Sequence, residues 1–150
     1  MIAVETVARE ATFTVYGVAQ PQGSKTAFVR GNRAILTDGR RKGAREAFAG
    51  WRASVATAAR DYQERHHEGL FDGPLAVTIT FYLPRPKTLP KRVLYPATRP
   101  DLDKLTRAVF DALSGVIIAD DARVVEMAIG KRFATETDPP HAFIAIREMV

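Results

Sequence analysis

Residues 99–113 organise the rest of this chain, and they read Arg99-Pro100-Asp101-Leu102-Asp103-Lys104-Leu105-Thr106-Arg107-Ala108-Val109-Phe110-Asp111-Ala112-Leu113. Apolar residues recur in this stretch at steps of three and four, which is typical of a helix with one buried face. We expect that helix to run from about Asp101 to Ser114 and to end at Gly115. Its polar face then carries Asp103, Arg107 and Asp111 at four-residue steps.

Two pairs of acids flank this predicted helix: Asp101 with Asp103 at its start, and Asp120 with Asp121 after its end. Carboxylates that meet in space repel one another, and a bound cation relieves that repulsion. Oxygen ligands without cysteine suit Mg²⁺ or Mn²⁺ better than zinc. Such an ion activates phosphodiesters and water, and Arg107 is placed to stabilise the charge that develops on the phosphate. We expect the chain after Gly115 to turn back so that Asp121 meets the helix entrance.

A purely structural explanation accounts for the same residues. Asp101 follows a proline and is a good helix N-cap, and acids in a first turn favour the helix dipole. Arg107 is spaced to form ion pairs with Asp103 and Asp111, and the two later acids are typical of a turn. Spacing alone favours this explanation over a metal site.

Elsewhere the chain alternates between strand and helix patterns. The clearest strand is Leu75–Leu83, and further strands are expected at residues 12–16, 123–133 and 142–147, with Val125, Met127, Ile129 and Phe133 sharing a face. Residues 43–65 form the best helix by period, and two short apolar pieces around Gly31-Asn32 predict a hairpin. We predict an α+β fold of two layers, in which a mixed sheet of four to six strands carries two main helices on one face.

Composition narrows the protein classes. At 150 residues the simplest organisation is one domain over residues 1–150. The absence of cysteine excludes disulfides and zinc-thiolate sites. No apolar run is long enough to span a membrane and no signal peptide is recognisable, so we expect a cytoplasmic protein. Lys and Arg outnumber Asp and Glu by 22 to 17, an excess that suits a polyanionic partner.

The basic residues concentrate in two segments that flank the long helix and precede the acids. One runs from Lys25 to Lys42, and the other is the proline-rich stretch from Pro84 to Pro100, too long for an ordinary connection. A solvated, Gly-rich loop explains the first segment as well as DNA contacts do, whereas loops as long as the second are usually functional or disordered. The candidate DNA-binding residues are Lys25, Arg30, Arg33, Arg40, Arg41, Lys42, Arg85, Lys87, Arg99 and Lys104.

A family resemblance changes the weighting between these explanations. The core of the RusA family of Holliday-junction resolvases reads Asp-Leu-Asp-Asn-Leu-x-Lys-Ala-x-x-Asp-Ala-Leu, followed by Asp-Asp and a strand with Val-Val. This chain closely resembles it from Asp101 to Leu113 and again at Asp120-Asp121-Ala122-Arg123-Val124-Val125. Arg107 stands where the family usually has Lys, and Lys104 where Asn is common.

The resemblance implies a homodimeric, Mg²⁺-dependent endodeoxyribonuclease, with Mn²⁺ as an alternative ion, that nicks four-way or branched DNA symmetrically in recombination and repair. It assigns the metal to Asp101, Asp103 and Asp121, places Asp120 beside them, and gives Arg107 the catalytic cation. Two other functions remain open. One is a non-catalytic basic DNA-binding module, and the other is a metal-dependent phosphoesterase for a small substrate.

Overall fold

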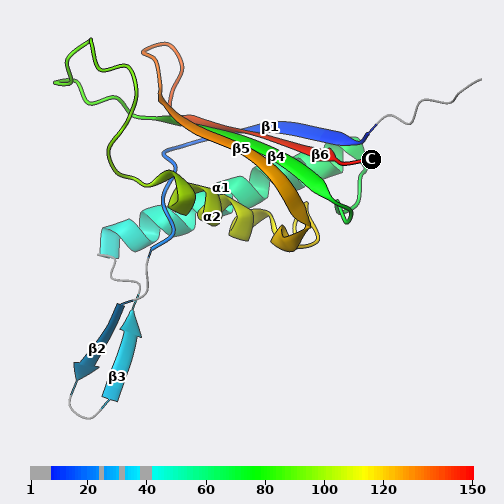
Figure 1. Cartoon of the computed structure of the whole chain (residues 1–150), viewed down its shortest axis with the longest axis horizontal. Helices are drawn as coiled ribbons and strands as arrows, with labels where there is room; N and C mark the ends of the chain where they lie inside the picture. The colour runs from blue at the N-terminus through cyan, green and yellow to red at the C-terminus, as the bar shows by residue number, and fades with distance from the viewer. Residues whose placement is uncertain (1–7, 24–25, 31–32, 38–41) are drawn as a thin grey trace, which may run out of the picture.

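The computed structural model describes residues 8–23, 26–30, 33–37 and 42–150 (Figure 1). The elements follow the predicted order of strand, hairpin, long helix, strand, helix, strand and strand. They are β1 (Glu10–Tyr16), β2 (Thr26–Arg30), β3 (Arg33–Thr37), α1 (Lys42–His66), β4 (Leu75–Leu83), α2 (Leu102–Leu113), a short 3₁₀ helix η1 (Asp121–Arg123), β5 (Val124–Phe133) and β6 (His141–Glu148). The predicted turn at Gly31-Asn32 lies outside the described residues.

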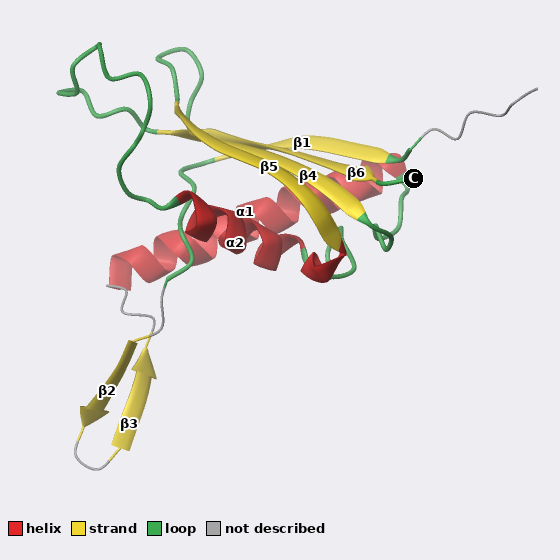
Figure 2. Ribbon diagram, in the orientation of Figure 1, coloured by secondary structure: helices red, strands yellow, loops and turns green. Residues whose placement is uncertain are grey.

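Four strands form the main sheet in the order β1-β6-β4-β5, while β2 and β3 pair separately as an antiparallel hairpin. Strand β6 runs antiparallel to both β1 and β4, whereas β5 runs parallel to β4. Both helices lie on one face of this sheet (Figure 2). The predicted α+β fold with a mixed sheet and two helices on one face is confirmed.

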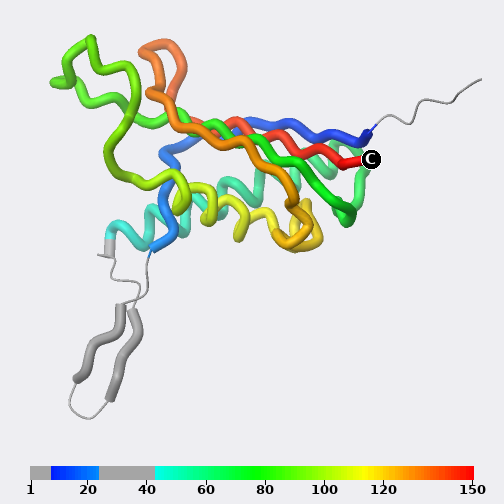
Figure 3. Tube along the Cα trace, in the orientation of Figure 1, coloured from blue at the N-terminus to red at the C-terminus, as the bar shows by residue number. Residues whose placement is uncertain are grey.

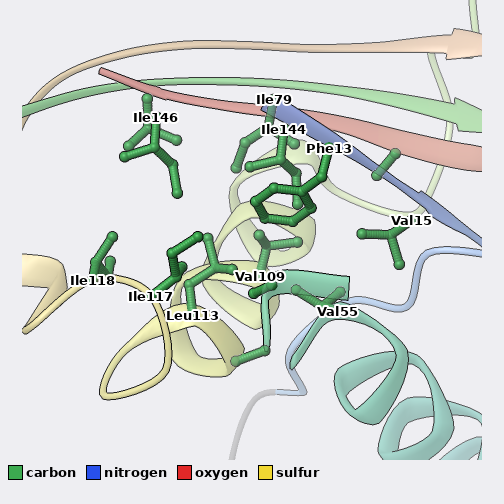
Figure 4. Close-up of a cluster of buried hydrophobic side chains, with 14 of the residues drawn as sticks. Phe13, Val15, Val55, Ile79, Val109, Leu113, Ile117, Ile118, Ile144 and Ile146 are labelled. Atoms are coloured by element: carbon green, nitrogen blue, oxygen red, sulfur yellow. The ribbon is translucent and has the colours of Figure 1, made fainter. Parts of the chain in front are cut away.

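The core fills the space between the sheet and the helices (Figure 4). Alternation along β4 turns Leu75, Val77, Ile79, Phe81 and Leu83 inward, and all five are buried. Helix α1 contributes Trp51, Val55, Ala59 and Tyr62 to this core. Burying a side chain of this size contributes about 1.5–3 kcal/mol, so these stripes fix the helices on the sheet.

Strand β5 departs from the predicted burial. The predicted shared face is wrong at Val125, because Val124 pairs with the buried Leu75 and Val125 falls at the register shift, where its exposed fraction is 60%. Met127 pairs with the buried Val77, yet its exposed fraction is 56%. Strand β5 is the edge of the sheet, and its pairing with β4 shifts register beside Leu75. The helices therefore cover only part of this strand and leave an apolar margin in solvent.

Within the described ranges, none of the helices is long and apolar enough to cross a membrane.

Candidate metal and nucleic-acid site

The entrance of α2 presents two uncommitted carboxylates. Asp101 occupies the N-cap position, but its side chain makes no capping hydrogen bond. Asp103 lies in the first turn, and both residues are exposed. The capping explanation therefore accounts for the position of Asp101 and leaves its carboxylate oxygens available to a ligand.

Lys131 holds the chain in front of these acids. Its Nζ donates hydrogen bonds to the carbonyl oxygen of Thr98, at 2.6 Å, and to that of Pro100, at 2.9 Å. It stands on β5 opposite Phe81, on the face of the strand that is turned toward the helices. The end of the proline-rich segment is thereby tied to the sheet directly before Asp101.

A pocket of about 540 Å³ opens beside Asp101. Its walls come from the loop after β1, the start of α1 and the start of α2, and they include Gln22, Arg99 and Lys104. The backbone N–H of Gln22 donates to the carbonyl oxygen of Lys104 at 2.9 Å, which joins the loop to the helix. Two cations and a carboxylate in one open pocket are suited to a phosphate group and a metal ion together.

The second pair of acids lies at the opposite end of α2. The chain leaves the helix at Leu113, and the backbone N–H groups of Val116, Ile117 and Ile118 all donate to the carbonyl oxygen of Leu113. Ile117 and Ile118 are fully buried, so this turn is anchored under the C-terminal end of the helix. The trace in Figure 3 then passes through η1 directly into β5.

Asp120 and Asp121 interact with each other, and Asp121 is also repelled by Asp111. Asp120 accepts a hydrogen bond from the N–H of Ala122 at 2.9 Å, and this bond lowers the pKa of Asp120. The hydrogen bond with Asp120 raises the pKa of Asp121, to which burial and repulsion from Asp120 and Asp111 add. Asp121 is thus a carboxyl group whose ionised form would be stabilised by a cation.

The expected meeting of Asp101 and Asp103 with Asp121 within one chain is wrong. Asp111, the neighbour of Asp121, lies ten residues along the helix from Asp101, which corresponds to about 15 Å. Ligand oxygens sit about 2.0–2.1 Å from Mg²⁺, so one ion cannot bridge that separation. Accordingly, no group of three or more acids or histidines that could hold a metal occurs among the described residues.

Arg107 is exposed near the middle of α2, between the two acidic ends. The predicted ion pairs with Asp103 and Asp111 are not formed among the residues that the structure describes. The ion-pair explanation for this four-residue spacing is therefore not supported, and the exposed guanidinium of Arg107 is accessible to a ligand.

The other predicted DNA-binding residues fall into three groups. Lys25, Arg40 and Arg41 lie outside the described residues, and Arg30, Arg33 and Lys42 are described by their backbone alone. Lys87 and Arg99 are exposed, while Lys104 is half-buried. Arg85 donates hydrogen bonds to the carbonyl oxygens of Val93 and Pro90, at 2.7 and 2.8 Å, and these bonds stabilise the conformation of the proline-rich loop.

Sequence reasoning missed three contributors to this region. Lys131 interrupts the apolar alternation of β5, which was a usable signal for a tethering role. Asp111 was recognised only as an ion-pair partner, although it acts on Asp121. Gln22 left no signal, because an amide in a Gly- and Pro-containing loop has no periodicity.

Comparisons with known proteins agree with this picture. The family model described as endodeoxyribonuclease RusA matches residues 24–147. A similar protein is the uncharacterized protein YqaN of Bacillus subtilis (strain 168), which is 29% identical over 147 residues. That alignment covers 91% of this chain and 95% of the relative.

Proposed function

Because this chain belongs to the endodeoxyribonuclease RusA family, we propose that it is a Mg²⁺-dependent nuclease that resolves Holliday junctions by paired, symmetric nicks. Membership indicates an endodeoxyribonuclease. The observation that carries the finer proposal is the pair of uncommitted carboxylates, Asp101 and Asp103, beside a pocket that contains Arg99 and Lys104.

The donor set suits a hard cation. Asp101, Asp103 and Asp121 supply carboxylate oxygens, with Asp120 adjacent, and the chain has no cysteine to favour a softer metal. Mn²⁺ fits the same ligands. When bound, such an ion polarises the phosphodiester and lowers the pKa of a water molecule. The raised pKa of Asp121 fits this assignment, since a cation would relieve the repulsion from Asp120 and Asp111.

We further propose that a second copy of the chain completes the site. Since the two acidic ends of α2 are about 15 Å apart, one ion can contact both only if they come from different copies. An antiparallel arrangement of two α2 helices about a two-fold axis places Asp101 and Asp103 of one copy against Asp121 of the other. The exposed Val125 and Met127 on edge strand β5, beside α2 and η1, give this contact an apolar component.

The two-fold arrangement also suits the substrate, because a four-way junction offers two equivalent strands to two equivalent sites. Within each site Arg107 stabilises charge on the phosphoryl oxygens, and Arg99 and Lys104 position the strand through its phosphates. Arginine carries the same charge as the lysine usual in the family but presents it as a planar fork.

The deciding experiment compares a synthetic four-way junction with linear duplex of the same sequences, each with and without Mg²⁺. We expect symmetric nicks in the junction only when the metal is present. The double variant Asp101→Asn/Asp103→Asn should lose cleavage while its junction binding stays intact or tightens, because the acids no longer repel DNA. Full cleavage by that variant would refute the assigned ligands.

A non-catalytic DNA-binding module is the second candidate, and one observation favours it: the acids do not converge within a single chain. Such a module would bind branched DNA with a steep salt dependence. It would produce no nicks with Mg²⁺ or Mn²⁺ on any DNA substrate, which separates it from the nuclease.

A further inference from the structure

The face of the main sheet opposite the helices carries a row of aromatic side chains. No described helix covers this face (Figure 2). Strand pairing places Tyr16, His141, Tyr82 and Arg132 side by side across all four strands. The Tyr82 ring stacks on the ring of His141, with centroids 4.3 Å apart and planes 16° apart, and the Tyr16 ring lies 5.7 Å from His141 on the other side.

The next row extends this surface. It contains Thr14, Phe143, Thr80 and Gly130, in which Phe143 is the one ring. The exposed fractions of Tyr16 and Phe143 are 63% and 37%, so both rings present apolar area to solvent. At Gly130 a Cβ atom would lie 3.3 Å from a terminal nitrogen of Arg132, so the guanidinium lies over this glycine.

Positive charge borders the aromatic row at its β5 end. The guanidinium of Arg132 also lies 5.3 Å from the ring centre of Tyr95, which is itself exposed. The loop after β4 and the loop between β5 and β6 rise together at this end of the sheet (Figure 1). They enclose a cleft of about 810 Å³ whose lining includes Lys87 and Lys91 along with one acid, Glu136.

Carboxylates lie at both ends of this face. Glu10 and Glu126 lie three rows from the aromatic row, and Arg147 stands in their row on β6. At the aromatic end a carboxylate oxygen of Asp138 lies 3.7 Å from Nε2 of His141, and Glu136 lines the cleft. Lys87, Lys91 and Arg132 outnumber these two acids, so a polyanion is attracted to the aromatic end of the face.

We propose that this aromatic face binds unpaired bases of single-stranded DNA, with the backbone phosphates in the cleft near Lys87 and Lys91. Bases stack on exposed rings without regard to sequence, and adjacent cations attract the backbone. Thr14 and Thr80 flank Phe143 with short side chains, which gives planar groups room to lie beside its ring. The buried core of a homodimer interface is more apolar than the rest of a protein surface, whereas threonines and Arg132 interrupt the rings of this face.

This inference rests on the DNA-binding part of the proposed function and not on its metal site. The two surfaces meet along β5: Lys131 points toward α2 and tethers the chain before Asp101, whereas its neighbour Arg132 points to the aromatic face. A strand that leaves the acidic site can therefore pass over this edge. Where a branched substrate carries an unpaired or displaced strand, the aromatic face would hold that strand.

The test measures binding of a fluorescent oligothymidylate of about 12 nucleotides, a length within the range that single-stranded DNA sites cover. Anisotropy is recorded with the full-length chain in EDTA, so that no cleavage occurs. Tyr16→Ala and Phe143→Ala should each weaken binding about 5- to 150-fold, the loss expected when one base loses its stacking partner. Tyr16→Phe keeps the ring and should bind within twofold of the wild type.

Controls separate this site from general effects. Thr12→Ala lies on the same face away from the rings and should leave binding unchanged. Linear duplex should bind equally well to the wild type and to Tyr16→Ala, and thermal unfolding should be similar because Tyr16 is largely exposed. Equal affinity of Tyr16→Ala and Tyr16→Phe for the oligonucleotide overturns the proposal, as does an equal loss of duplex binding.

Two further readouts complete the test. A shift of Tyr16→Ala to a smaller species in sedimentation would assign the face to contact between copies and would also overturn the proposal. Junction cleavage in Mg²⁺ is measured in parallel. Absence of cleavage by the wild type, with ring-dependent oligonucleotide binding intact, would refute the proposed nuclease and support the aromatic face as a DNA site.

Discussion

Mixing two inactive variants tests whether the acids of one site come from two copies. The first variant is Asp101→Asn/Asp103→Asn, which alters the entrance of α2, and the second is Asp121→Asn, which alters its far end. Each variant alone lacks a complete set of acids, whether a site lies within one chain or is shared between two copies. The variants are combined in equal amounts, allowed to exchange subunits and assayed on a nicked-product gel with a four-way junction and Mg²⁺.

The geometry fixes the expected recovery. In a mixed dimer, one site combines both altered ends and the other combines the intact Asp101 and Asp103 of one copy with the intact Asp121 of its partner. Random exchange makes about half of the dimers mixed, each with one intact site of two, so about one quarter of the wild-type sites return. These dimers cut only one strand, and the product is a nicked junction without full resolution.

If each site lay within one chain, every site in the mixture would carry an altered ligand, and exchange would restore nothing. Continued inactivity of the mixture would therefore refute the two-copy site, provided that copies carrying different affinity tags are shown to exchange. A matched control mixes Asp101→Asn/Asp103→Asn with a tagged version of itself, which must stay inactive.

Four further predictions follow from individual contacts. Arg107→Ala should lower kcat about 10²- to 10³-fold without weakening junction binding, whereas Arg107→Lys should retain most activity. Lys131→Met removes two hydrogen bonds and should cost about 1–3 kcal/mol in urea unfolding, with a larger loss of cleavage because the acids shift. The pKa of Asp121 is raised, so protons compete with the metal at a higher pH than they do at an ordinary aspartate. The Mg²⁺ concentration needed for half-maximal cleavage should therefore rise as the pH falls. Asp111→Asn removes one source of repulsion and should move that rise to lower pH. Ile118→Ala should cost about 2–5 kcal/mol in urea unfolding, whereas Ile118→Val should cost about 1 kcal/mol, because the side chain is fully buried.

Local patterns predicted the elements well because single side chains determine them. The alternation of Leu75–Leu83 predicted β4 with its boundaries, and the stripe at residues 102–113 predicted α2 to within about one residue at each end. Gly115 ends the helix region with a φ of 78°, a conformation that glycine adopts without a steric penalty. In each case the sequence pattern that predicts the element lies within the residues that form it.

Long-range placement was harder to predict. The order β1-β6-β4-β5 pairs the first strand with the last, and no local period encodes that choice. The path after α2 depends on where Ile117 and Ile118 become buried, and their short apolar run fits a turn under the helix as well as a return to its entrance. That ambiguity produced the wrong expectation that Asp121 meets Asp101 within one chain.

The separation of the acids also bears on folding and on control of the chemistry. Carboxylates gathered at one point repel each other until a proton or a metal ion neutralises them. A single chain avoids most of this repulsion, because Asp101 and Asp103 lie far from Asp121, and only the group around Asp121 shows it as a raised pKa. Under the proposed two-copy site, the full repulsion arises only when two copies meet, where a bound metal offsets it. A single copy would then have no complete site, so cleavage would require two copies to be assembled.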